Sequence, residues 1–258
     1  MTSLRNILLR LEYHGTNFHG FQIQKNAPTI QAAIEEALLK LTKEKIRIAS
    51  ASRTDAGVHA LDHVITFRTK TTIDLRAFSH GLNQLLPHTI RVQEAHDILI
   101  TFQVQKMAYK KEYAYFIVTD KKNHVMNKYS WNLYTDLAIE PMQKCLSMIV
   151  GKHDFSSFRA SDCDSVSPIR EIYKAQISRI KNPFLGNVRF YKITIQGNGF
   201  LKHMVRNIVG TIVDVGAGKT SIADFKKIIA SKDRREAGMT APAQGLFLMK
   251  TWIRKRLK

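Results

Sequence analysis

Residues 5–41 read RNILLRLEYHGTNFHGFQIQKNAPTIQAAIEEALLKL, and they establish the pattern from which the rest of the fold is predicted. Apolar and charged side chains alternate from Ile7 to Tyr13, which predicts a strand with one buried face. After a turn-rich segment, Thr29 is suited to cap a helix. That helix carries an apolar stripe formed by Ile30, Ala33, Ile34, Ala37, Leu38 and Leu41. Residues 5–41 therefore predict a strand followed by an amphipathic helix.

The same pattern continues as far as residue 94. Short strands are predicted at 46–50, 64–68 and 89–94. A second helix is predicted to open at Asp74 and to run to about Leu86, where Pro87 ends it. The order strand, helix, strand, strand, helix, strand is that of a ferredoxin-like lobe.

The second half of the chain repeats this order loosely. Strands are predicted at 111–118, 170–180, 188–196 and 245–253, and helices at 139–150, 200–213 and 221–230. The strands at 170–180 and 188–196 are expected to pair across the turn signal KNPFLGN. We therefore predict an α+β fold of two ferredoxin-like or RRM-like lobes with a mixed, largely antiparallel sheet, related by an old duplication. The lobes are expected to span residues 1–104 and 105–258, with a linker near residues 101–110.

The chain is strongly basic. Its 258 residues include 40 Lys and Arg against 21 Asp and Glu, a formal net charge of +19. Residues 1–104 hold 12 basic and 9 acidic side chains (net +3), whereas residues 105–258 hold 28 and 12 (net +16). A hydrophobic content of 44% argues against a disordered basic tail. The charge favours a polyanionic partner, nucleic acid first and an anionic membrane second, with a surface kept soluble by lysine as the alternative.

Cysteine content and targeting signals indicate the compartment. Cys145 and Cys163 are two thiols in a chain long enough to need no disulfide, which favours a reducing cytoplasmic setting. Arg10 and Glu12 break the N-terminal apolar run, so no signal peptide is expected. No apolar stretch has the length of a membrane helix. A soluble cytoplasmic protein is the expectation.

No cofactor or metal is expected. Gly218-Lys219-Thr220 resembles the end of a phosphate-binding P-loop, but Val213 stands where that loop needs its first glycine. The segment is better explained as the end of one helix, with Thr220 or Ser221 capping the next. The histidines lack the spacing and the third ligand of a zinc site.

The segment ASRTDAGVHA, residues 51–60, follows a predicted strand and places Arg53, Asp55 and Gly57 within five positions of a loop. A carboxylate two residues from a guanidinium can stay ionised in a partly dry pocket. That arrangement suits a nucleophile or general base acting on an uncharged group beside phosphates. The alternative is a simple turn, in which Asp55 accepts backbone hydrogen bonds and Gly57 supplies a positive φ.

This segment closely resembles the G-R-T-D-A-G-V-H-A motif of the tRNA pseudouridine synthase A family, in which the aspartate is the catalytic nucleophile. Further landmarks of that family occur in order along nearly the whole chain: residues 13–16, 20–22, 29–31, 82–83, 85–87, 153–155 with Phe158, 199–207 and 241–246. A ten-residue motif among several others is hard to reach by chance. The chain is therefore identified as a member of the family, with the pseudouridine synthase fold.

The resemblance implies a reaction. Members isomerise uridine to pseudouridine in the tRNA anticodon stem-loop, conventionally at tRNA positions 38 to 40. They break the N-glycosidic bond and rejoin the sugar to carbon 5 of the uracil. The reaction is redox-neutral and needs no cofactor or metal. The active enzyme is expected to be a homodimer in which one tRNA touches both subunits.

The resemblance also implies catalytic roles. Asp55 corresponds to the nucleophile, and Arg206 to the arginine that pairs with the catalytic carboxylate. Such a pair would keep Asp55 ionised at neutral pH. Tyr113 corresponds to the tyrosine that stacks on the uracil and helps to remove the carbon-5 proton. Its period-2 partner Tyr115 is the alternative core residue, and either tyrosine could be simple strand packing.

Substrate-binding roles follow in the same way. Arg53 corresponds to the arginine that holds the flipped nucleotide out of its stack, and extrusion is required for the enzyme to reach the far edge of the base. Leu246 corresponds to an apolar wall of the pocket. Phosphate contacts are expected from basic residues, each of which could instead be a solubilising surface charge: Lys110, Lys111, Lys202 and Arg254–Arg256.

The sequence departs from the family pattern at five places: Ser52, Gln103, Gln105, Lys106 and Gln244. These departures put the choice of target uridine in doubt, while the central chemistry is retained. Three hypotheses follow: an active tRNA pseudouridine synthase, including a diverged paralogue with a shifted target; a non-catalytic tRNA-binding or RNA-folding protein; and a general basic protein of the ribosome or nucleoid. Only the first requires the carboxylate–arginine motif.

Overall fold

The computed structural model describes residues 3–119, 125–181 and 188–254. The chain divides into two units, one made of residues 1–110 with 248–258 and the other of residues 111–247. The boundaries lie inside two strands, β5 (Ala108–Thr119) and β10 (Leu246–Ile253), so each of these strands contributes residues to both units.

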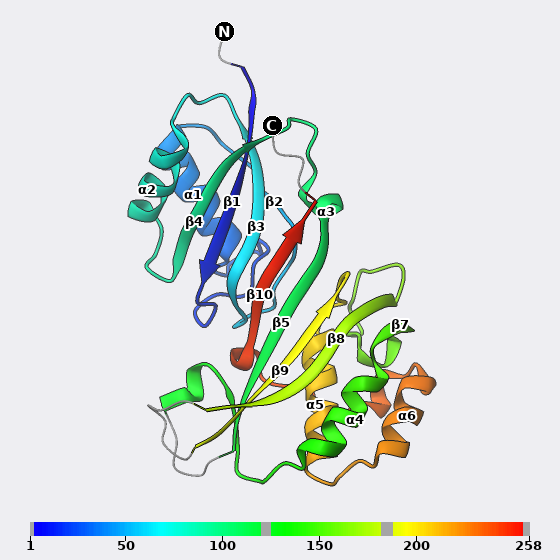
Figure 1. The fold of residues 1–258 in the computed structure, drawn as a ribbon. Coiled ribbons are helices and arrows are strands. Elements are labelled where there is room, and N and C mark those ends of the chain that lie inside the picture. Colours follow the sequence, from blue (N-terminus) through cyan, green and yellow to red (C-terminus); the bar gives the residue numbers. More distant parts are fainter. Residues whose placement is uncertain (1–2, 120–124, 182–187, 255–258) are drawn as a thin grey trace. The chain divides into compact units, whose positions relative to one another are not determined.

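The first unit is a sheet backed by helices, in which β1 pairs antiparallel with β3 and β4. Its strands run in the order β4-β1-β3-β10, and β2 also pairs with β3. Helices α1 and α2 contact each other and lie against one face of the sheet (Figure 1). The elements are β1 (Arg5–Tyr13), α1 (Ile30–Thr42), β2 (Ala49–Ser50), β3 (His59–Thr69), α2 (Leu75–Leu85), β4 (Ile90–Ile98) and α3 (Val104–Met107). Through β4 this is the predicted ferredoxin-like order.

Local signals positioned these elements as expected. Ile7, Leu9 and Leu11 of β1 are fully buried. The Thr29 hydroxyl caps α1 by accepting a hydrogen bond from the Ala32 amide at 3.3 Å. The strand predicted at 46–50 is shorter than expected, because only residues 49–50 pair with β3.

The C-terminal strand is tied into the first unit by a half-buried polar cluster. The Arg10 guanidinium lies 2.5 Å from Asp62 Oδ1. Asp62 Oδ2 accepts a hydrogen bond from the Thr251 amide at 3.1 Å, and the Thr251 hydroxyl donates to the Asp62 carbonyl at 3.0 Å. This cluster joins β1, β3 and β10 across long sequence separations.

The division of the chain therefore differs from the expected lobes 1–104 and 105–258. The first unit continues to residue 110, and residues 248–258 return to it. The last strand was expected in the second lobe because periodicity shows that a strand exists but does not show which strand it pairs with.

The second unit has the same plan. Its strands run in the order β5-β9-β8-β7 with antiparallel neighbours, while β6 pairs in parallel with β5. Helices α4, α5 and α6 contact one another beside this sheet (Figure 1). The elements after β5 are β6 (Trp131–Leu133), α4 (Ile139–Met148), β7 (Gly151–Asp154), β8 (Ile169–Ile180), β9 (Arg189–Gly197), α5 (Met204–Gly216) and α6 (Ile222–Ser231). The order β5-α4-β8-β9-α5-β10 is the predicted loose repeat.

Two details of the second unit bear on the predictions. The helix expected at 200–213 begins at Met204, because His203 takes a left-handed φ of 61° and residues 200–203 form a loop. The segment that resembled a P-loop is a helix junction: α5 ends at Gly216, and Ser221 caps α6. Most of the KNPFLGN turn, residues 182–187, lies outside the described residues.

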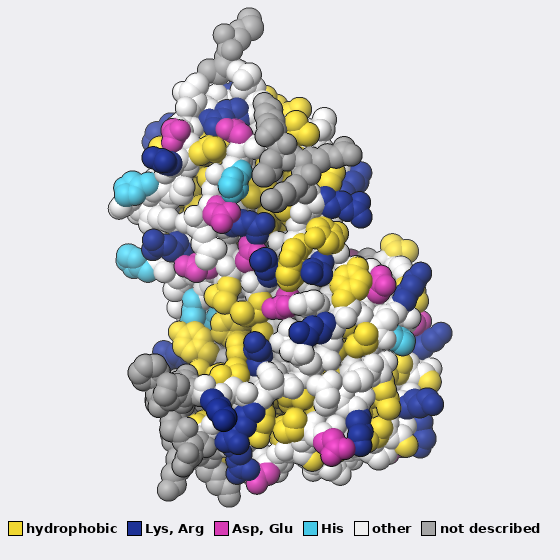
Figure 2. All heavy atoms as spheres, in the orientation of Figure 1, with side chains coloured by type: hydrophobic (Ala, Val, Ile, Leu, Met, Phe, Trp, Pro, Cys, Tyr) yellow, Lys and Arg dark blue, Asp and Glu magenta, His cyan; other side chains and the backbone are white. Residues whose placement is uncertain are grey.

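Among the described residues, no helix is both long and apolar enough to cross a membrane. On the face seen in Figure 2, Lys and Arg side chains are dispersed among neutral ones rather than gathered into one continuous patch. The positive charge is therefore available over a wide area of this face.

Candidate active site

Asp55 lies on the loop between β2 and β3. Its side chain is half-buried, between the exposed Arg53 and the exposed Ala56, while Thr54 is buried. The Asp55 carbonyl accepts a hydrogen bond from the Val58 amide at 3.2 Å, and Gly57 has a φ of 78°. The loop thus has the tight turn that the alternative predicted, and it carries the carboxylate that the catalytic hypothesis requires.

A second loop, residues 14–21, packs backbone to backbone against the Asp55 loop. The Phe21 amide donates to the Thr54 carbonyl at 3.1 Å, and the Gly57 amide donates to the Phe18 carbonyl at 3.2 Å. Gly20 has a φ of 91°, and a Cβ at this position would lie 2.8 Å from the Thr54 carbonyl oxygen. The glycine is needed because the two backbones approach this closely. The family landmarks at residues 13–16 and 20–22 therefore include the loop that supports the Asp55 loop.

In the second unit, the two candidate tyrosines of β5 have different surroundings. Tyr115 is fully buried and donates a hydrogen bond to the Pro242 carbonyl at 2.7 Å. Burial raises the pKa of the Tyr115 hydroxyl, although the positive charge of Arg206 opposes that shift. The Tyr113 ring is 7% exposed and meets the Phe200 ring edge-on, with centroids 5.0 Å apart. Tyr115 is thus a core residue, and Tyr113 lies beside the loop that precedes α5.

Arg206 lies near the start of α5 and is held by the segment that precedes β10. Its Nε donates to the Ala241 carbonyl at 2.7 Å, and the Ala241 amide donates to the Arg206 carbonyl at 3.1 Å. Leu246, at the first position of β10, is 5% exposed. It follows Gly245, where a Cβ would lie 2.7 Å from the Tyr115 ring. Residues 241–246 therefore connect Arg206, Tyr115 and Leu246.

The basic candidates differ in their partners. The pKa of Lys111 falls to about 8, first because burial disfavours its charge and then because Arg170 is nearby. Lys202 Nζ lies 2.5 Å from Asp162 Oδ2, and Lys110 Nζ lies 3.9 Å above the Trp252 ring. Arg254 is exposed, and residues 255–256 lie outside the described ranges.

Each predicted residue can be assigned to a unit. Arg53, Asp55, Lys110 and Arg254 belong to the first, and the others belong to the second: Lys111, Tyr113, Lys202, Arg206 and Leu246. Within the second unit, Arg206 bonds to Ala241 in the segment 241–246, which also contains Leu246. Lys202 instead pairs with Asp162.

Sequence reasoning gave no role to Phe200, Pro242 or His63. Phe200 lies in a landmark and could have been found from its neighbour Tyr113 only with the structure in hand. Pro242 acts through a backbone carbonyl, which no side-chain pattern reveals. His63 had a signal, since it is a polar residue inside the apolar strand β3.

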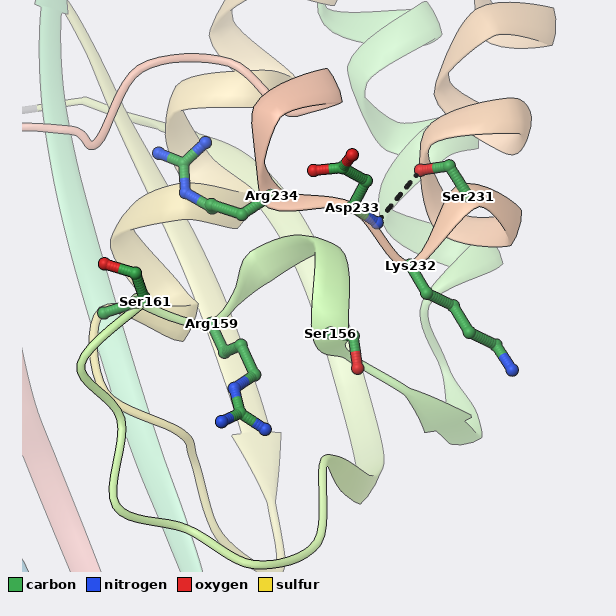
Figure 3. Close-up of a pocket in the computed structure, with 8 residues that line it drawn as sticks. Ser156, Arg159, Ser161, Ser231, Lys232, Asp233 and Arg234 are labelled. Atoms are coloured by element: carbon green, nitrogen blue, oxygen red, sulfur yellow. Dashed lines mark hydrogen bonds between the residues drawn. The ribbon is translucent and has the colours of Figure 1, made fainter.

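The pocket drawn in Figure 3 contains none of the predicted residues. It is lined by Ser156, Arg159, Ala160, Ser161, Ser231, Lys232, Asp233 and Arg234. The guanidinium of Arg234 donates to Ala237, Asn207 and Thr240, and Asp233 binds Arg235. In the close-up, the side chains of Arg159, Lys232 and Arg234 extend in different directions. Because its charges are used within the protein and do not converge, we do not place the active site there.

The described residues contain no group of three or more His, Cys, Asp or Glu side chains arranged to hold a metal ion. The chemistry offered by the predicted residues is that of a carboxylate, a guanidinium and a phenol.

Comparison with known proteins gives matches over most of the chain. The family described as tRNA pseudouridine synthase matches residues 11–105 and 146–251. The chain is similar to proteins named tRNA pseudouridine synthase A. The Thermoanaerobacter sp. (strain X514) protein is 43% identical over 96% of this chain and 99% of its own. The Geotalea daltonii protein is 41% identical over 96% of this chain and 100% of its own. A Myxococcus xanthus protein of the same name is 36% identical over 95% of this chain and 91% of its own. The family match includes Asp55, Arg206 and Leu246, and it leaves out residues 106–145, where Tyr113 lies.

Proposed function

The chain belongs to the tRNA pseudouridine synthase family, and from that premise we propose that it isomerises uridine to pseudouridine in tRNA. The observation that carries the proposal is the loop at residues 53–59, which presents a half-buried aspartate on a backbone packed against residues 14–21. A nucleophile needs this kind of rigid support, because misplacement of the reacting atom lowers the rate steeply.

The proposed chemistry uses three side chains. The Asp55 carboxylate attacks carbon 1′ of the sugar and forms an ester as the bond to N1 breaks, and the uracil leaves with the electron pair on N1. The uracil then turns, and carbon 5 bonds to carbon 1′ as the Asp55 ester bond breaks. N1 takes up a proton, which balances the proton lost from carbon 5. Tyr113 stacks on the uracil and helps to remove the proton from carbon 5. Arg206 pairs with the carboxylate, and the hydrogen bond from its Nε to the Ala241 carbonyl orients its guanidinium.

The proposed substrate contacts follow from exposure and charge. Arg53 is exposed and is suited to hold a flipped nucleotide. Leu246 supplies an apolar wall. Lys111 supplies a phosphate contact, since no hydrogen bond or ion pair to its ammonium is formed by the residues that the structure describes. Lys110, Lys202 and Arg254–Arg256 add weaker phosphate contacts.

We propose the anticodon stem-loop as the target, at tRNA positions 38 to 40, with a homodimer as the active form and the cytoplasm as its location. A shifted target is a second candidate, favoured by one observation. Gln103, Gln105 and Lys106 replace residues usual in the family and are all exposed around α3, where they can contact RNA. Ser52, another departure, has a buried hydroxyl without a hydrogen-bond partner among the described residues.

The test is a modification map. The protein is incubated with unmodified tRNA transcripts, and pseudouridine is located at nucleotide resolution. Product at positions 38 to 40 is expected, and Asp55→Asn should give none. Product only at other uridines would support the shifted target. RNA binding without any product would instead support a non-catalytic tRNA-binding protein.

A further inference from the structure

A chain of buried hydrogen bonds runs beneath the Asp55 loop. The Tyr13 hydroxyl lies 2.8 Å from the Thr54 hydroxyl and 2.7 Å from His63 Nδ1. On the other side of the ring, His63 Nε2 lies 3.0 Å from the Ser50 hydroxyl. The Ser50 hydroxyl in turn donates to the Ser52 carbonyl and accepts from the Ser52 amide at 3.1 Å. The chain draws on β1, β2 and β3, all within the first unit.

The centre of this chain is closed to solvent. His63 is 0% exposed, Tyr13 4% and Thr54 7%. The Phe21 ring stacks on the imidazole, with centroids 4.3 Å apart and planes 23° from parallel. Removing one member takes a hydrogen bond from its neighbours that water cannot replace in this position.

Counting donors gives an arrangement of protons that satisfies every hydrogen bond with a neutral His63. The Ser50 hydroxyl has one proton, which it gives to the Ser52 carbonyl. His63 Nε2 must therefore carry a proton and donate to Ser50. A neutral His63 then accepts at Nδ1 from the Tyr13 hydroxyl, and Tyr13 accepts from Thr54. All of these bonds point in one direction, so a neutral imidazole satisfies the chain without any charge.

The chain of hydrogen bonds holds the Asp55 loop on both sides of Arg53. One end binds the backbone of Ser52 and the other binds the side chain of Thr54, the residue before Asp55. We propose that His63 is a positioning residue for the reaction: it links these two anchors and so fixes the direction in which the Asp55 carboxylate is presented. This inference rests on the proposed function, in which Asp55 is the nucleophile. His63 lies three residues beyond the ten-residue motif, so the resemblance assigns it no role.

The variants separate the polar role from the packing role. His63→Phe keeps an aromatic ring against Phe21 and removes both ring nitrogens. His63→Gln keeps an amide that can donate to Ser50. Tyr13→Phe removes a single oxygen from the same chain. His96→Phe is the matched control, because His96 is exposed on β4 and contacts Glu94.

Single-turnover and steady-state kinetics on a tRNA substrate measure the effect. For His63→Phe we expect kcat to fall about 100-fold, the scale of a reacting group misplaced by about 1 Å, while KM and the tRNA Kd change less than about twofold. His63→Gln should recover most of the loss. Tyr13→Phe should fall between the two, and the double variant His63→Phe with Tyr13→Phe should be little worse than His63→Phe alone.

Amide hydrogen exchange supplies a readout that does not depend on activity. Exchange at residues 52–56 should accelerate in His63→Phe and not in His96→Phe. If the wild type makes no pseudouridine but exchange still accelerates, the proposed function fails, while the support of the Asp55 loop by His63 stands. If the wild type is active and both kinetics and exchange are unchanged in His63→Phe, the proposal is overturned. Should His63→Phe fail to fold, Tyr13→Phe is decided by the same two measurements.

Discussion

In the first unit, the side chains beneath the Asp55 loop include the buried Tyr13 hydroxyl and the buried His63 imidazole, whereas in the second unit Lys111, two residues from Tyr113, is only half-buried and has a lowered pKa. Neutral hydroxyls and an imidazole can be buried when every hydrogen bond is satisfied. Burying a lysine costs more free energy, because burial disfavours its charged form. The buried Tyr13 and His63 side chains therefore suit the positioning of a nucleophile, and the Lys111 ammonium suits contact with a phosphate.

Removing the carboxylate should have the largest effect. Asp55→Asn is expected to lower kcat by about 10⁴-fold or more, because covalent chemistry is lost while the loop geometry is kept. Binding of tRNA should change less than about threefold, since Asp55 carries no positive charge with which to contact phosphates and the substitution removes only one negative charge. Rate and filter-binding measurements on the same preparation check both parts. Retained isomerisation in Asp55→Asn would assign the nucleophile elsewhere.

The close backbone approach beneath the loop can be broken at Gly20. Gly20→Ala places a Cβ 2.8 Å from the Thr54 carbonyl at a φ of 91°. We expect it to cost about 2–4 kcal/mol in the free energy of unfolding, from strain and overpacking together. Gly218→Ala is the matched control, because it also has a positive φ of 74° but nothing within 4 Å of the new Cβ. It should cost only about 1–2 kcal/mol. Equal losses in urea unfolding would show that the approach to Thr54 is unimportant.

The contribution of Lys111 to tRNA binding should depend on pH. With a pKa of about 8, Lys111 is charged at pH 7 and neutral near pH 9.5. Lys111→Met should lower the slope of log K against log salt for tRNA by about 1 at pH 7, with no change at pH 9.5. A slope change that is the same at both pH values would mean that Lys111 does not titrate in this range.

The lowered pKa of Lys111 also predicts how the free energy of unfolding depends on pH, with the opposite trend to its contribution to tRNA binding. Between pH 8 and about 10.4, the unfolded chain holds a proton that folded Lys111 has lost. Stability therefore rises with pH across this window, in the wild type relative to Lys111→Met. Chemical unfolding of the two proteins at several pH values checks the sign.

The smallest effect is expected at Lys202. Its ammonium already pairs with Asp162, and both side chains are exposed at 43% and 68%. Lys202→Gln should change stability by less than about 1 kcal/mol and tRNA affinity by about twofold or less. A tRNA affinity loss larger than that of Lys111→Met at pH 7 would reverse the order of the two lysines.

Much of the fold followed from the sequence alone, because its signals are local. Alternation over β1, the cap at Thr29, the cap at Asp74 and the junction before Ser221 each depend on residues a few positions apart. Such interactions are set by strand and helix periods and by capping hydrogen bonds. The loop around Asp55 was found for the same reason, since its motif is continuous.

The tertiary structure decided what depends on distant residues. Thr251 returns to Asp62 across 189 positions, and this contact joins residues 248–253 of the last strand to the first unit. The late start of α5 depends on the left-handed His203, and the partner of Lys202 is an aspartate 40 residues away. His63 gains its role only when β1, β2 and β3 meet around it. Periodicity states which face of an element is buried, but the partner on that face is chosen by packing over the whole chain.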